Sequence, residues 1–166
     1  MAVVSPITRD LAIDGWGLAG VGIAGLIAAS VVIDGGAGRA IIPFIIVALV
    51  FGLAQVVVSG GWLRTAVDDA PAAPPDLVPE AESATIRRAG LPSLIALVLL
   101  VLALVVWVQF AALLAGLAFS AGMTDLRSRQ WISALERERG VTILREVARL
   151  PFATARKPLW ARARGD

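Results

Sequence analysis

The 166-residue sequence contains no histidine, cysteine or tyrosine, and its single lysine is Lys157. Without cysteine there is no disulfide, thiolate nucleophile or iron–sulfur ligand, and without histidine there is no imidazole base and no ordinary zinc or haem ligand. A serine–lysine dyad inside a membrane is excluded too, because Lys157 follows every apolar stretch. We therefore expect no catalytic residue, no metal site, no cofactor and no enzymatic activity.

Charge is also missing from three long stretches, residues 15–33, 40–63 and 89–124, which hold 19, 24 and 36 residues. The whole chain is 58% hydrophobic and 17% charged, whereas soluble domains carry about 25% charged residues. A soluble helix needs a polar face, and a bilayer span needs about 20 apolar residues. The sequence therefore predicts an all-α membrane protein.

We predict three transmembrane helices. Spans at about residues 13–33 and 40–60 form an N-terminal hairpin within residues 1–62, because the Gly-rich segment 34–39 can reverse the chain. The third helix, at residues 92–123, would be about 45 Å long. This is too long for one upright crossing and too short for two crossings plus a turn. We expect one long, tilted helix, and the alternative of a membrane-inserted hairpin stays open.

Small residues in the first span predict a helix contact. Gly20, Ala24 and Ala28 form a stripe at four-residue spacing, and such stripes let helix backbones approach closely in a membrane. We expect this stripe to pack within the protein's own bundle, with contact to another membrane subunit or a second copy as the alternative.

Basic residues predict the orientation. Ten of the 15 follow the third span, and basic residues beside a span remain cytoplasmic. Three crossings in the plasma (inner) membrane then place the N-terminus outside and the C-terminus inside, with 11 basic residues inside and 4 outside. The hairpin alternative would place both termini inside, with 14 basic residues against 1.

Two aqueous segments remain. Residues 63–91 form an acidic, Pro-rich linker, with five acids and four prolines between positions 68 and 82. Residues 124–166 form a basic amphipathic tail of net charge +5, with helices at about 124–139 and 141–150. We expect the tail to bind anionic lipid headgroups on the cytoplasmic leaflet through Arg145, Arg149, Arg156, Lys157, Trp160, Arg162 and Arg164. A protein partner is the alternative, and nucleic acid is not expected.

Taken together, these features indicate a non-catalytic, multi-pass accessory or assembly subunit of a larger membrane complex. The main alternative is a self-assembling pore or small transporter subunit. A membrane enzyme that acts on lipid headgroups through Asp14, Asp34 or the acidic linker with a bound metal is the least favoured hypothesis.

Overall fold

The computed structural model describes residues 2–34, 37–147 and 158–163, and most of these are helical. The elements follow the order β1 (Val3–Pro6), α1 (Ile7–Val32), α2 (Gly38–Asp68), β2 (Val78–Pro79), α3 (Glu82–Ala89), α4 (Leu91–Val106), α5 (Val108–Arg139), β3 (Val141–Glu146) and β4 (Leu159–Ala163). Among the described residues, four helical stretches are long and apolar enough to cross a membrane: Ile7–Val32, Gly38–Asp68, Glu82–Val106 and Val108–Arg139. The prediction of a mostly helical chain with membrane-length helices is confirmed.

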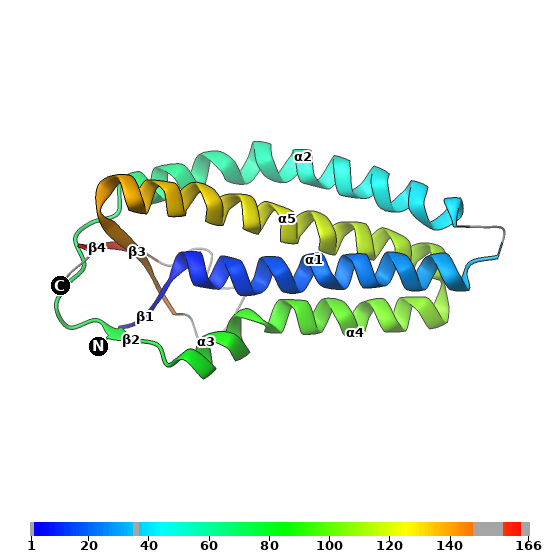
Figure 1. The fold of residues 1–166 in the computed structure, drawn as a ribbon, viewed down its shortest axis with the longest axis horizontal. Coiled ribbons are helices and arrows are strands. Elements are labelled where there is room, and N and C mark those ends of the chain that lie inside the picture. The colour runs from blue at the N-terminus through cyan, green and yellow to red at the C-terminus, as the bar shows by residue number, and fades with distance from the viewer. Residues whose placement is uncertain (1, 35–36, 148–157, 164–166) are drawn as a thin grey trace.

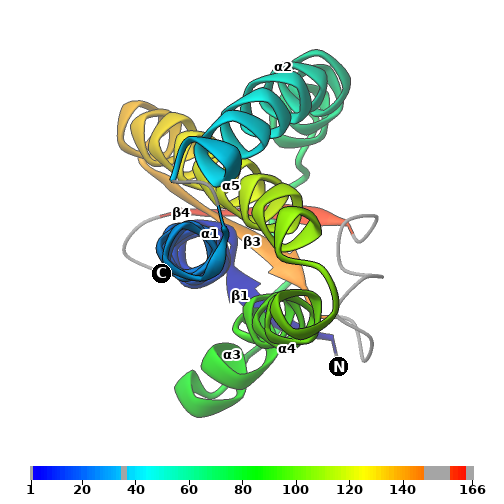
Figure 2. The same cartoon turned by 90° about the vertical axis from the view of Figure 1, so that its right-hand side faces the viewer.

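Helices α1, α2, α4 and α5 lie side by side along the long axis of the molecule, and each runs opposite to the one before it (Figure 1). Helix α5 lies between α2 on one side and α1 and α4 on the other (Figure 2). The C-terminal end of α1, the N-terminal end of α2 and the α4–α5 turn share one end of the bundle, here called the turn end. The four strands and α3 lie at the opposite end, here called the sheet end.

The segment predicted as one tilted helix, residues 92–123, is instead a helical hairpin. The backbone at Trp107 is extended (φ −161°, ψ 101°) and separates α4 from α5. The Trp107 ring stacks on Phe110, and its Nε1 donates to Gln109 Oε1 at 3.1 Å. The length of the uncharged run does not reveal this hairpin, for two physical reasons. The chain reverses at a single residue, and both arms extend into charged sequence, since the first begins at Glu82 and the second continues to Arg139.

The second predicted tail helix, at about 141–150, is also wrong in its described part, because Val141–Glu146 is strand β3. Gly140 ends α5 in the left-handed region (φ 64°), a conformation that favours glycine. The following Val-Thr-Ile-Leu is rich in β-branched residues, which fit a half-buried strand. The fold class is therefore a helical bundle with a small sheet at one end.

The sheet has the strand order β2-β1-β3-β4. Strand β1 pairs parallel with β2 and antiparallel with β3, with Ser5 opposite Arg145, and β3 pairs antiparallel with β4. Because β1 and β3 are neighbours, they lie on the same side of any membrane that the helices cross. This pairing contradicts the expectation that the N-terminus and the C-terminal segment lie on opposite sides.

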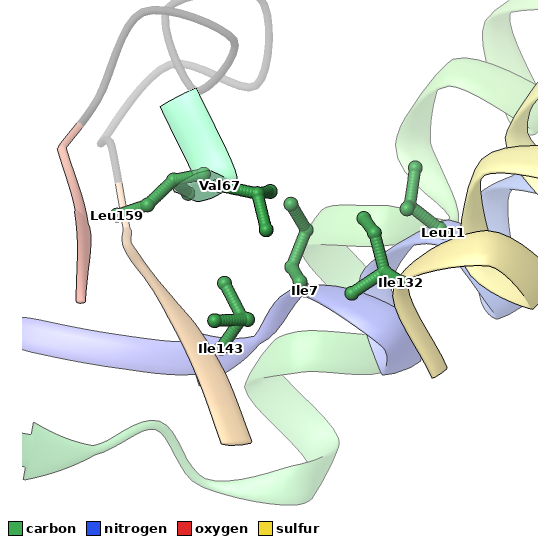
Figure 3. Close-up of a cluster of buried hydrophobic side chains, with 6 residues drawn as sticks. All are labelled: Ile7, Leu11, Val67, Ile132, Ile143 and Leu159. Carbon is green, nitrogen blue, oxygen red and sulfur yellow. The ribbon is translucent and has the colours of Figure 1, made fainter. Parts of the chain in front are cut away.

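An apolar core joins the sheet to the helices. Its buried side chains come from α1, α2, α5, β3 and β4, and they are Ile7, Leu11, Val67, Ile132, Ile143 and Leu159 (Figure 3). Full burial of a side chain of this size contributes roughly 1.5–3 kcal/mol. The core fixes the sheet against three helix ends and so holds distant parts of the sequence together at the sheet end.

Candidate functional site

A buried ion network at the sheet end is centred on Arg88 of α3. Its Nη2 donates to both carboxylate oxygens of Asp10, at 2.9 and 3.0 Å. Its Nη2 and Nε also donate to the two carboxylate oxygens of Glu80, at 2.9 and 3.2 Å. The side chains of Arg88, Asp10 and Glu80 are only 14%, 7% and 8% exposed. Arg88 therefore forms ion pairs with two buried carboxylates and ties the linker and α3 to α1.

Two hydroxyl groups complete this network. Ser5 Oγ donates to Asp10 Oδ1 at 2.8 Å, and Thr85 Oγ1 donates to Glu80 Oε2 at 2.7 Å. Burial acts to raise the pKa of Glu80, but hydrogen bonds from Arg88 and Thr85 and the nearby positive charge outweigh it and hold that pKa below its usual value. The end of the predicted linker is thus fixed to the bundle.

A second group of charged residues lies next to this network and shares a cavity with it. Asp14, Arg145 and the Asp10–Arg88 pair line a small cavity of about 70 Å³. Within the described part of the chain, the buried Oδ1 of Asp14 accepts no hydrogen bond. Burial lowers the pKa of Arg145, while the negative charges of Asp10 and Asp125 partly oppose that shift. No group of three carboxylates that could hold a metal ion is found among the residues that the structure describes.

The placement of Arg145 corrects its predicted role at the membrane surface. Along β3, Arg145 points to the same face as Ile143, which belongs to the apolar core against the helices. The alternation of the strand therefore turns Arg145 toward the bundle and its carboxylates, away from a lipid surface. In the predicted amphipathic helix, Arg145 would instead lie on the polar face, at the lipid headgroups.

The remaining predicted surface residues lie in β4 or outside the described residues. Trp160 is half-buried opposite Leu144, and its indole Nε1 has no described hydrogen-bond partner. Arg162 is partly exposed opposite Thr142. The other four residues lie outside the described residues: Arg149, Arg156, Lys157 and Arg164.

Helix α1 packs through a different set of small residues from the predicted one. Its contact with α5 uses Gly15, Ala19 and Gly22, and a Cβ at Gly22 would lie 2.7 Å from the carbonyl oxygen of Ala115. From the α5 side, a Cβ at Gly122 would lie 2.5 Å from the backbone nitrogen of Ala19. Backbone contact on this scale requires glycine.

The predicted stripe faces away from this contact. Gly20 and Ala24 are exposed and Ala28 is partly buried, and, apart from the adjoining backbone of α1 itself, no described atom lies within 4 Å of a Cβ built at Gly20. The contact of α1 with α5 therefore uses other small residues than the predicted stripe. The many small residues of α1 allow more than one stripe, and the sequence does not indicate which one faces α5.

The sequence-based reasoning missed the ion network. Asp10 and Asp14 are four positions apart and share a helix face, which is a visible signal that two acids project together. Their partner Arg88 is 78 positions from Asp10, so only the fold reveals the pairing. Comparison of the chain with protein-family models, curated proteins and solved structures found no match, so no known protein suggests a function for this site.

Proposed function

We propose that the protein is a non-catalytic multi-pass membrane protein that serves as an accessory or assembly subunit of a larger membrane complex. The supporting observation is the outward face of α1. It carries the stripe Gly20, Ala24 and Ala28, of which the first two are exposed, beside the large apolar residues Trp16 and Ile27, which are 66% and 60% exposed.

Such a face suits contact with another transmembrane helix. Lipid tails are as apolar as leucine, so helices in a bilayer associate through close packing rather than through the hydrophobic effect. Small residues allow that close packing, and the flanking large residues can surround the approaching helix. Helix α1 already uses one small-residue face for α5, and the second face is free to bind a partner helix.

The proposal includes a revised orientation, with the sheet end at the cytoplasmic face of the plasma membrane. Arg39 is the one basic residue between the apolar runs of α1 and α2, and no basic residue lies between those of α4 and α5. The other 14 basic residues all lie toward the sheet end of the sequence pattern. One precedes the apolar run of α1, three lie between the apolar runs of α2 and α4, and ten follow the apolar run of α5. This distribution agrees with the positive-inside rule. The tail after α5 then meets the anionic cytoplasmic leaflet.

Cysteine crosslinking in membranes tests the subunit proposal. The natural chain has no cysteine, so a single introduced thiol reports one position without background. Gly20→Cys should form a crosslinked species with a second polypeptide, and Ala54→Cys, on the exposed face of α2, is the matched control. Gly20→Leu together with Ala24→Leu should abolish co-purification of that polypeptide, whereas Ala54→Leu should not.

Two results would contradict the proposal. One is recovery of the protein only as a monomer, with no crosslink from position 20 in membranes. The other is a flux of ions or small solutes through liposomes that contain the purified chain, above that of empty vesicles. Flux would favour the alternative of a pore or small transporter subunit.

A further inference from the structure

A larger cavity of about 340 Å³ lies between α2 and α5, away from the ion network. Its polar wall is formed by Arg64, Thr124, Arg127 and Ser128, and Leu63 and Trp131 contribute to its apolar wall. The volume falls within the range of about 300–1,000 Å³ that is typical of small-molecule sites. Two separate helices therefore border a space, open to the surface, that combines cationic, hydroxyl and apolar groups.

Among the described residues, no carboxylate lines this cavity to balance its two arginines. No Asp or Glu is among its lining residues, and neither Arg64 nor Arg127 forms an ion pair with any residue in the described ranges. The guanidinium of Arg64 lies over the Trp131 ring, 5.7 Å from its centroid, and this cation–π contact holds the group in place. Arg64 and Arg127 are both exposed and line the same cavity without a described carboxylate partner, which favours an anion, and their planar guanidinium groups suit phosphate.

The level of the cavity along the helices, relative to a membrane, indicates the source of that phosphate. The uncharged run of α2 ends at Leu63, directly before Arg64, and that of α5 ends at Thr124, three residues before Arg127. In a membrane-spanning bundle these positions lie at the level of the headgroups. Trp62 lies between the lining residues Gly61 and Leu63 in the sequence and is 48% exposed, and tryptophan is enriched at this level. The wall formed by Val56 extends the site toward the apolar run of α2.

We infer that this cavity is a binding site for the phosphate group of an anionic membrane lipid. Arg64 and Arg127 bind the phosphate oxygens, Ser128 donates a further hydrogen bond, and Val56 and Leu63 contact the apolar part of the lipid. Basic pockets between transmembrane helices are known to bind anionic headgroups. The inference depends on α2 and α5 crossing the membrane and is independent of any protein partner.

Binding of defined lipids to the purified full-length chain, measured by native mass spectrometry from detergent, tests this site. Phosphatidylglycerol should bind with higher affinity than phosphatidylcholine, whose net charge is zero. Arg64→Gln combined with Arg127→Gln should weaken phosphatidylglycerol binding by about tenfold or more, because charge-assisted hydrogen bonds to both groups are lost. Arg87→Gln combined with Arg137→Gln removes the same charge from exposed positions at the sheet end and should change binding less than about twofold.

A charge-neutral variant, a folding check and a second probe complete the test. Ser128→Leu narrows the cavity without a change in charge and should also weaken phosphatidylglycerol binding, and circular dichroism of each variant checks that the helices are intact. Unchanged binding in folded variants of both kinds would overturn the inference, as would an equal loss in the control pair. Inorganic phosphate is the second probe. If it bound as tightly as phosphatidylglycerol, the site would be one for free phosphate and the lipid assignment would be wrong.

Discussion

Between the helices, glycines such as Gly22 and Gly122 let α1 and α5 touch through their backbones, whereas at the sheet end Arg88 binds two buried carboxylates beside an apolar core. The two regions solve different physical problems. Within a bilayer, apolar surface gains little by leaving lipid, so close contact has to supply the stability. At the sheet end, water is the competing solvent, so burial of apolar groups and pairing of charges become effective.

The two regions also differ in the kind of substitution that they tolerate. A backbone contact cannot adapt to an added side chain, because neither helix can yield without loss of the rest of the contact. An ion network responds instead to the loss of a single partner, which leaves the opposite charge buried and unpaired. We therefore expect additions to be damaging between the helices and deletions to be damaging at the sheet end.

The largest effect is expected from Gly122→Leu. A Cβ at this position would lie 2.5 Å from the Ala19 nitrogen and 2.6 Å from the Gly15 carbonyl oxygen, so α1 and α5 must separate. The loss should exceed the roughly 1–3 kcal/mol of ordinary overpacking, seen as failure to recover a monodisperse protein. Gly20→Leu is the control on α1 because its site is open. Equal recovery of both variants would show that the α1–α5 contact does not determine stability.

Arg88→Gln should be the next most damaging change. It leaves the Asp10 and Glu80 carboxylates buried without their cation, and loss of one partner of a buried pair costs about 3–5 kcal/mol. The free energy of unfolding in mixed micelles measures this effect. Arg87→Gln, next to it but exposed, should change stability by less than about 0.5 kcal/mol. Similar values for the two variants would show that the network contributes little.

The bundle was more predictable than the sheet end, for physical reasons. A bilayer requires long uncharged runs, so the sequence predicts spans at about 13–33 and 40–60, which overlap the observed helices Ile7–Val32 and Gly38–Asp68. The reversal at Trp107 gave no comparable signal, because neither glycine nor proline occurs there. The count of 14 basic residues against 1 favours the hairpin, whereas the length of the uncharged run favours a single helix.

The sheet end depends on contacts between distant parts of the sequence. Strand β1 pairs with β3 across more than a hundred residues, and each strand is too short to stand out by periodicity. Gly140 followed by β-branched residues was a local signal for β3 that the basic amphipathic pattern obscured. The α1 stripe that faces α5 was likewise undetermined, because the choice between stripes depends on where α5 lies.

A smaller effect is expected from acid. The pKa of Glu80 is lower in the folded protein than its ordinary value of 4.5, so ionised Glu80 favours the folded state. This contribution is complete above pH 4.5 and is lost as the pH falls through the lowered pKa. Wild-type protein should therefore be more stable than Glu80→Gln at pH 7, and the difference should shrink below pH 4.5. A difference that stays constant down to pH 3 would show that the charge of Glu80 is not what stabilises the sheet end.

The smallest effect is expected for the exposed ion pair of Arg139 and Asp68, which joins the ends of α5 and α2. Arg139 Nη2 donates to Asp68 Oδ1 at 2.7 Å, but the two side chains are 44% and 53% exposed. Solvent screens such pairs, so Asp68→Asn should lower the free energy of unfolding by less than about 1 kcal/mol, and about 1 M salt should remove the difference. The effect of Arg88→Gln should persist in the same salt, because its charges are buried. Since both sites pair arginine with a carboxylate, a loss in Asp68→Asn as large as that in Arg88→Gln would mean that burial is not what gives the sheet-end network its strength.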